Sequence, residues 1–246
     1  MNSTNKYLLL SLLAILVVGY VTGVAVWSSR RMTRNVCHAV KVLITDKEER
    51  QYVDEKEIVS MLKKQGIYPL GKPLVSMSVQ RIEDAVIAHP MVREAECYTL
   101  SSGALCIRLC QRVPVLRVVT ADDTYFVDSD RLRMPVRESV TADVLTATGA
   151  IGERLACKEL SDIAIMVGND QYWHDRIARI HVVTPNYVYL VQQPDGTRLI
   201  LGKPEGIERK LAKLRKLYDN VFDQIGWRTY DEIDLRFHGQ IVGRNN

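Results

Sequence analysis

The chain has 246 residues, with 33 basic and 29 acidic side chains and a formal net charge of +4. Charges of both signs are interleaved, so no block of like charge indicates a nucleic-acid-binding arm. The five cysteines are odd in number and lack Cys-x-x-Cys or Cys/His ligand spacing, which indicates neither a disulfide framework nor a zinc site.

An uncharged, mostly apolar run extends from Tyr7 to Trp27. At about 1.5 Å of helical rise per residue it reaches roughly the 30 Å of a bilayer's hydrocarbon core. A cleaved signal peptide would have a shorter apolar region, roughly 7–15 residues, closed by a small-x-small site. The sequence therefore predicts a retained transmembrane helix over residues 7–29, preceded by a short tail over residues 1–6.

The charges around this run leave its orientation open. Lys6 precedes the run, whereas Arg30, Arg31 and Arg34 follow it. The positive-inside rule alone would place the long C-terminal part in the cytoplasm. This rule is a weak guide for a single span that is followed by a large domain.

The segment after the run has the pattern of a β-α-α-β-β unit with two helices on one face of a small sheet. Asp54 is a good N-cap for a first helix that Gly66 ends, and a second helix from about Ser78 ends by Pro90. A turn centred near Ser102 would place Cys97 opposite Ile107 as a small buried side chain. The expected strands are 36–44, 92–99 and 104–111.

Beyond Pro114 the pattern changes to many short strands and a few helices. The basic side chains of the last helix are expected to form a solvated face; they are Lys203, Arg209, Lys210, Lys213, Arg215 and Lys216. The expected strands are 115–120, 125–127, 177–183, 187–191, 198–201, 230–237 and 240–242, and the expected helices are 158–167 and 207–222.

Candidate catalytic or metal-binding residues are few. The densest carboxylate cluster is Asp122, Asp123, Asp128 and Asp130, and no EF-hand glycine and glutamate follow it. Aspartates between short strands are typical of turns. His174 and His181 have no third ligand nearby in the sequence. The sequence therefore predicts no enzyme, no cofactor, no metal site and no small-molecule substrate.

Several segments, taken in order, resemble the FtsQ/DivIB family of single-pass bacterial cell-division proteins. The first part offers YVDEKEIVSMLKKQGI, and HPMVREAEC stands where the family has Pro-x-Val-x-x-Ala-x-Val. The later matches are IRLCQRVPV, TYFVDSDRLRMPV, VLTATG and the ending YDEIDLRFHGQIVGR. Two positions depart from the family pattern, because Gln111 replaces the usual Glu and Arg131 stands where Gly is common.

The resemblance implies an α+β fold with four parts. A cytoplasmic tail over 1–6 and a transmembrane helix over 7–29 would precede a POTRA-like β-α-α-β-β domain over 36–112. A mixed β domain with an open C-terminal edge would follow over 113–246. The bulk of the chain would then lie outside the cytoplasm, periplasmic and anchored in the inner membrane at the division septum.

The resemblance also implies a non-catalytic scaffold that links division proteins. FtsB-like and FtsL-like partners would bind by β-strand addition at the C-terminal strand, and other divisome proteins through the POTRA domain and the transmembrane helix. Arg244 stands where some members have an aromatic residue. The residues that match the partner site are Phe237, Gly239, Gln240, Ile241, Val242, Gly243 and Arg244.

Three other interpretations remain open. A POTRA-bearing factor for envelope-protein assembly or export would normally carry repeated POTRA units or a barrel-length series of strands. A membrane-anchored periplasmic enzyme would need a convergent constellation of catalytic residues. The final strand could also be part of an ordinary terminal hairpin with no partner.

Overall fold

The computed structural model describes residues 13, 15–24, 36–137, 142–222 and 230–245. The chain divides into two compact units, Met1–Gln111 and Arg112–Asn246. Leu13 and residues 15–24 are helical, but no helix in the described part of the chain is both long and apolar enough to cross a bilayer. The predicted tail over 1–6 and much of the predicted span over 7–29 lie outside the described residues.

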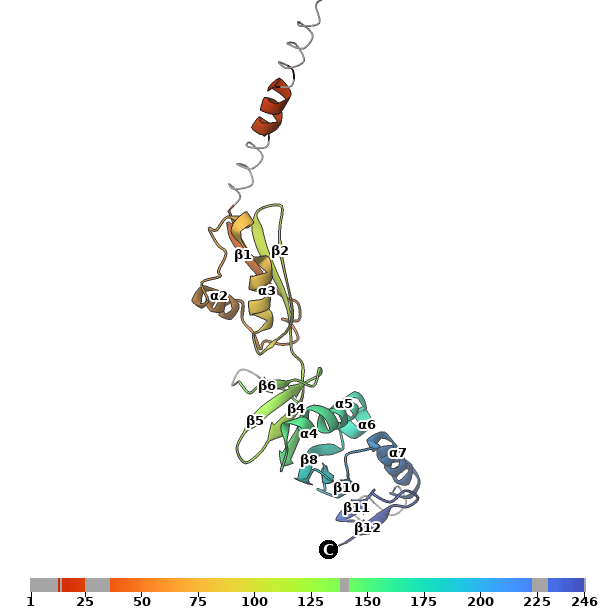
Figure 1. The fold of residues 1–246 in the computed structure, drawn as a ribbon. Helices are drawn as coiled ribbons and strands as arrows, with labels where there is room; N and C mark the ends of the chain where they lie inside the picture. Colours follow the sequence, from red (N-terminus) through yellow and green to blue (C-terminus); the bar gives the residue numbers. More distant parts are fainter. Residues whose placement is uncertain (1–12, 14, 25–35, 138–141, 223–229, 246) are drawn as a thin grey trace, which may run out of the picture. The chain divides into compact units, whose positions relative to one another are not determined.

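From Val36 on, the first unit contains a three-stranded sheet with the α-helices α2 and α3, in the predicted β-α-α-β-β order (Figure 1). The strand order is β1-β3-β2, with β1 parallel and β2 antiparallel to the central β3. Cys97 pairs with Ile107, as the sequence predicted. The elements are β1 Ala39–Ile44, α2 Glu55–Lys64, η1 Leu74–Ser76, α3 Val79–Ile87, β2 Val92–Thr99 and β3 Ala104–Gln111.

Helices α2 and α3 begin where the sequence predicted, after the predicted cap Asp54 and at Ser78, which also proves to be a cap. The Asp54 carboxylate accepts a hydrogen bond from the Lys56 N–H, and the Ser78 hydroxyl accepts one from the Arg81 N–H. Such caps satisfy backbone donors that have no partner within the helix. The helices contribute buried apolar side chains at helical spacing, namely Ile58, Leu62, Ile82 and Val86.

Cys97 is a core residue, as predicted, with 8% of its surface exposed. Burial, with a smaller contribution from the nearby Glu83 charge, raises the pKa of its thiol to about 12. The thiol is therefore neutral and unreactive at physiological pH. All five cysteines are free.

The buried Gln111 ties the end of β3 to the segment that leads into α2. Its Oε1 accepts hydrogen bonds from the N–H groups of Tyr52 and Val53, at 2.8 and 2.9 Å. Its Nε2 donates to Asp46 Oδ1 at 3.2 Å and to the Arg50 carbonyl at 2.9 Å. The amide thus makes two bonds as acceptor and two as donor.

The second unit is built on one mixed sheet, nine-stranded within the described residues, in the order β12-β11-β10-β9-β8-β7-β4-β5-β6. The pairs β4–β7, β7–β8 and β10–β11 are parallel, and the others are antiparallel. The strands are β4 Pro114–Val119, β5 Thr124–Asp128, β6 Arg133–Pro135, β7 Leu145–Gly149, β8 Ile177–Thr184, β9 Tyr187–Gln192, β10 Arg198–Gly202, β11 Glu232–Asp234 and β12 Val242–Arg244.

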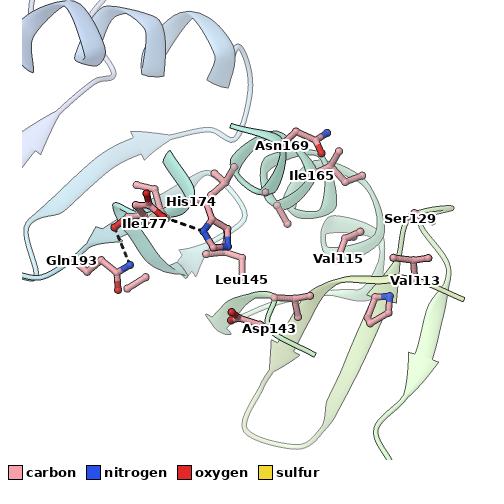
Figure 2. A pocket seen from close by; sticks show the side chains of 17 residues that line it. Val113, Val115, Ser129, Asp143, Leu145, Ile165, Asn169, His174, Ile177 and Gln193 are labelled. Carbon is pink, nitrogen blue, oxygen red and sulfur yellow. Dashed lines mark hydrogen bonds and ion pairs between the residues drawn. The ribbon is translucent and has the colours of Figure 1, made fainter. Parts of the chain in front are cut away.

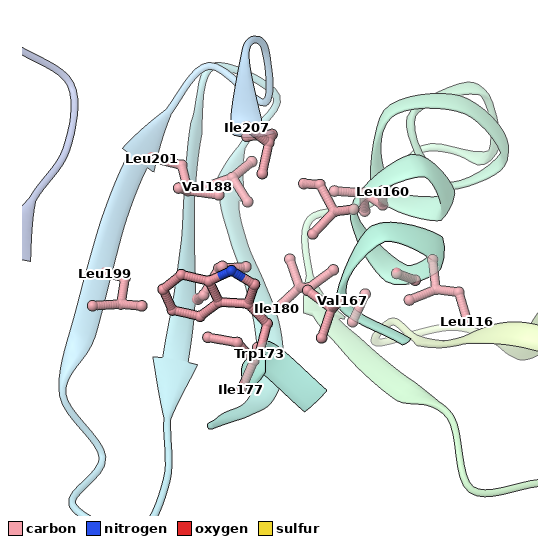
Figure 3. Packing of buried hydrophobic residues seen from close by; sticks show 14 of the residues in the cluster. Leu116, Leu160, Val167, Trp173, Ile177, Ile180, Val188, Leu199, Leu201 and Ile207 are labelled. Carbon is pink, nitrogen blue, oxygen red and sulfur yellow. The ribbon is translucent and has the colours of Figure 1, made fainter. Parts of the chain in front are cut away.

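The core of this unit lies between the sheet and its helices (Figure 3). The Trp173 indole lies among apolar side chains of the sheet and of α5, and its ring centroid is 6.4 Å from that of Tyr218. The buried Tyr218 hydroxyl donates to Gln192 Oε1 at 2.6 Å. The helical segments are α4 Glu153–Leu155, η2 Ala156–Leu160, α5 Ser161–Asn169, α6 Gln171–His174, α7 Ile207–Leu217 and η3 Tyr218–Phe222.

The closing strands are shorter than the sequence predicted. Strands β11 and β12 replace the expected ranges 230–237 and 240–242, and the residues between them form a loop. The loop begins where Arg236 turns back to bind Asp234, with its Nη2 2.6 Å from the carboxylate. The carbonyl groups of Phe237 and Gln240 bind Lys213 rather than a neighbouring strand.

Candidate protein-binding edge of the second unit

Strand β12 forms one end of the large sheet. It pairs antiparallel with β11, in a register that places Val242 opposite Asp234 and Arg244 opposite Glu232. No other strand of the described residues pairs with its outer side. An edge strand presents unpaired N–H and C=O groups, which can template pairing with another chain.

Helix α7 holds the loop that precedes β12. Lys213 Nζ donates hydrogen bonds to the carbonyl oxygens of Phe237 and Gln240, at 2.7 and 2.9 Å. Partial burial, together with the neighbouring Arg209 charge, lowers the pKa of this amine. One ammonium group therefore fixes both ends of the loop and sets where β12 starts.

A close contact beneath β12 requires glycine at position 243. A Cβ atom at Gly243 would lie 2.5 Å from Cδ1 of the Tyr230 ring, well inside van der Waals contact. Tyr230 and the half-buried Ile241 both pack against the core of the unit. The backbone of the C-terminal strand therefore packs directly against the Tyr230 ring.

Ion pairs surround the β11–β12 hairpin. Burial opposes ionisation of Asp234, but the hydrogen bonds and charge of Arg236 outweigh it, so the pKa of this carboxyl is below its ordinary value. Arg198 Nη2 lies 2.7 Å from Glu232 Oε1 across the parallel β10–β11 pair. The Arg236 guanidinium also lies over the Tyr187 ring, 5.6 Å from its centroid.

The structure divides the seven predicted partner-binding residues between the loop and the strand. Phe237, Gly239 and Gln240 lie in the exposed loop, and 42% of the Phe237 surface is exposed. Ile241 and Val242 are half-buried, whereas Gly243 and Arg244 are exposed. Together with His238, which was not among them, these residues make up the segment 237–244 that leads into and forms the edge strand.

The expectation of a wholly solvated basic face on α7 was wrong for two lysines. Lys213 holds the loop before β12, and Lys210 Nζ donates to the carbonyl groups of Leu201 and Lys203 at 2.8 and 2.9 Å. Lysines three residues apart share a face of a helix, but sequence spacing does not show that loop carbonyl groups lie opposite that face. Tyr230 was also missed, because its contact depends on the pairing of β11 with β12.

The predicted carboxylate cluster serves turns and ion pairs. Asp128 is buried, accepts the N–H groups of Asp130 and Leu132, and pairs with Arg112 Nη1 at 2.8 Å. Asp123 pairs with Arg133. These bonds confirm the interpretation as turns. Among the described residues, no group of three or more His, Cys, Asp or Glu side chains could hold a metal ion.

A separate cavity of about 720 Å³ lies where β4, β7 and β8 begin, beside the end of α5 (Figure 2). Val115, Leu145 and Ile177 supply apolar walls, and His174 lies at the rim with Nδ1 3.5 Å from Asp175. His174 was predicted to lack a third ligand, and within the described residues its ring pairs with the Asp175 carboxylate. The described residues that line the cavity include no convergent set of catalytic groups.

The fold and its terminal edge define a class of protein in which a POTRA-like domain precedes a mixed β domain with an open final strand. A family model for the POTRA-like domain matches residues 35–110. A second model, described as FtsQ/DivIB, C-terminal related, matches residues 113–244. A cell division protein FtsQ of Salinibacter ruber (strain DSM 13855 / M31) is 26% identical over 195 residues, which cover 71% of this chain and 72% of that protein.

The chain belongs to the FtsQ/DivIB family of cell-division proteins. The resemblance stated from the sequence is thus confirmed, as is the POTRA-like domain. The family is one of non-catalytic division proteins, which agrees with the prediction that the chain is not an enzyme.

Proposed function

We propose that this protein is a membrane-anchored scaffold at the division septum, and that its C-terminal edge receives a β-strand from an FtsB-like partner. An FtsL-like protein would join through that partner. The observation that carries the proposal is the position of β12 at the end of the nine-stranded sheet, with its outer side unpaired within the described residues.

The chemistry of the edge suits an extended segment. Backbone pairing would supply most of the affinity, and side chains that flank the strand would supply specificity. Phe237 offers an exposed aromatic surface beside the strand, and Arg244 offers a positive charge on the strand itself. An acidic residue in the partner strand would complement Arg244, in place of the aromatic residue that some family members have there.

The binding test compares Val242→Pro with Val242→Thr. Proline removes an N–H group and fixes φ, whereas threonine keeps the donor and has high strand propensity. Val242→Pro should abolish co-purification with the partner complex, and Val242→Thr should bind nearly as the wild type does. Circular dichroism controls for folding, and a folded proline variant that binds normally would place the docking surface elsewhere.

We infer that the run from Tyr7 to Trp27 anchors the protein, with its N-terminus in the cytoplasm and both units outside it. The length and apolar character of the run support this anchor. Arg30, Arg31 and Arg34 argue for the opposite orientation. A reporter that is active only outside the cytoplasm should be active when it is fused after Asn246. Activity of a cytoplasmic reporter at the same position would show that the orientation is the opposite of the one proposed.

The division role is distinguished from envelope-protein export by depletion of the protein in its host. Loss of a septal scaffold should give filamentous cells that fail to divide. A defect in outer-membrane protein assembly without filamentation would instead support an export factor.

A further inference from the structure

Three segments of the first unit meet at the end where β1 begins. The Cys37 N–H donates to the Lys72 carbonyl at 2.9 Å, and the Gly71 N–H donates to the Cys37 carbonyl at 2.7 Å. Val36 forms an isolated bridge with Pro73. The His38 N–H donates to the Gly103 carbonyl in the turn between β2 and β3. We call this surface, made of residues 36–38, 68–77 and 100–103, the end face.

The end face exposes three large apolar side chains. Val36, Leu70 and Val75 are 44%, 49% and 65% exposed. Leu70 and Val75 lie on either side of Lys72 in the sequence, in the segment that includes η1 and that Pro73 bridges to Val36, just before β1. Exposed apolar groups gathered on one surface indicate a contact with another apolar phase or partner.

The charge of the end face has one sign. Its three segments contain His38 and Lys72 and no Asp or Glu. Lys63, at the end of α2, lies over the Tyr68 ring, 5.1 Å from its centroid. Arg30, Arg31 and Arg34 come just before Val36 in the sequence. Basic side chains that flank apolar ones are attracted to anionic lipid surfaces.

The covalent chain limits how far the end face can be from the apolar run. Only residues 28–35 separate Trp27 from Val36, so the two Cα atoms lie within about 30 Å even if the chain is fully extended. The end face contains Val36 and is therefore the part of the unit that the chain holds within reach of the membrane.

We propose that the end face docks on the anionic lipid surface beside the anchor, with Leu70 and Val75 entering the headgroup region. This inference rests on the proposed anchor. The chain length, the exposed apolar side chains and the absence of carboxylates in the three segments together favour lipid over a protein occupant. Docking would fix the orientation of the first unit relative to the bilayer.

The test uses the full chain reconstituted in vesicles, with a tryptophan placed at an exposed apolar position. Val75→Trp probes the end face. Ile87→Trp is the matched control, because Ile87 is 42% exposed but is the last residue of α3, which leads to the start of β2 at the opposite end of the sheet. The tryptophan fluorescence of each variant, minus that of the wild type, is the emission of the added tryptophan. Lipids brominated on their acyl chains quench this emission when they contact the indole ring.

If position 75 enters the membrane interface, brominated lipids should reduce the emission of the tryptophan added by Val75→Trp about twofold. They should leave the emission of the tryptophan added by Ile87→Trp unchanged. Lys72→Glu, combined with Val75→Trp, should weaken the quenching in vesicles that contain phosphatidylglycerol. Circular dichroism and thermal unfolding check that each variant is folded.

The other outcomes overturn the inference at different points. Protein that fails to float with the vesicles would disprove the anchor, and the docking with it. Protein that floats while the Val75→Trp emission is unquenched would disprove docking alone. Emission that shifts only after FtsB-like and FtsL-like partners are added would identify the end face as a protein-binding surface instead.

Discussion

Gln111 and Asp46 are joined twice, because both the backbone N–H and the side-chain Nε2 of Gln111 donate to Asp46 Oδ1, each at 3.2 Å. A glutamate at position 111 would place a negative oxygen where Nε2 now lies, directly beside the Asp46 carboxylate. The family's usual glutamate does not fit this arrangement, and the amide of Gln111 is the group that satisfies it.

We expect Gln111→Glu to destabilise the first unit. The substitution replaces a buried donor that serves Asp46 and the Arg50 carbonyl with an acceptor, and a buried polar group without its partner costs about 1–3 kcal/mol. The loss should diminish at acidic pH, where the new carboxyl is protonated. Denaturant unfolding at two pH values measures the effect.

Gln80→Glu is the matched control, because Gln80 Nε2 also donates to a carboxylate, that of Asp84, but on an exposed helix surface. Its effect should remain within about 0.5 kcal/mol. Equal changes in the free energy of unfolding for the two substitutions would show that the buried hydrogen bonds of Gln111 contribute no more to stability than the exposed one of Gln80.

Arg131 has a left-handed backbone, with φ of 63°, at the position where the family commonly has glycine. This conformation costs a non-glycine residue roughly 1–2 kcal/mol. Arg131→Gly should therefore leave the stability unchanged or raise it, even though it removes an exposed ion pair with Asp162 that contributes about 0–1 kcal/mol. Thermal unfolding of Arg131→Gly and Arg131→Val tests this, and a valine variant as stable as the glycine variant would contradict it.

Asp234 should contribute to stability at neutral pH and lose that contribution in acid. Burial raises the pKa of Asp234, but the hydrogen bonds and charge of Arg236 lower it by a larger amount. The folded-state pKa therefore lies below the unfolded value of about 3.9. A depressed carboxyl pKa stabilises the fold above the unfolded value, and this stabilisation is lost as the pH falls through the folded value. The stability difference between the wild type and Asp234→Asn should shrink below about pH 4. Asp122→Asn, at an exposed turn, is a control that should change the stability by no more than about 0.5 kcal/mol.

Gly243→Ala should displace β12, because the added methyl group would meet the Tyr230 ring. Overpacking of this kind typically costs about 1–3 kcal/mol, and the displaced edge should bind the partner complex less tightly. Gly239→Ala is the control, since no atom lies within 4 Å of the Cβ position there. A Gly243→Ala variant that unfolds and binds as Gly239→Ala does would show that the contact with Tyr230 is dispensable.

The first unit could be predicted closely from the sequence because its signals are local. Asp54 and Ser78 mark helix starts within a few residues of the helices they cap, and the tight turn near Ser102 fixes the pairing of Cys97 with Ile107. Each of these relationships depends on chain neighbours or on one hairpin.

The second unit was less predictable because its decisive pairings join distant segments. The parallel pairs β4–β7, β7–β8 and β10–β11 leave no turn signal in the sequence. The place of the final strand was anticipated, with residues 238–239 left between strands, but Phe237 and Gln240 were expected in strands and lie in a longer loop. That loop depends on Lys213, whose partners are 24 and 27 residues away.

The parallel pairing of β1 with β3 has a mechanical consequence. The chain enters the unit at the start of β1 and leaves it at the end of β3, and Ala39 lies opposite Ala104 while Ile44 lies opposite Leu109. Tension between the entering and leaving segments would pull these two strands along their length in opposite directions. Such shear loads all the evenly spaced bonds of the ladder together instead of opening them one at a time. The unit is therefore suited to carry force along the chain without unravelling.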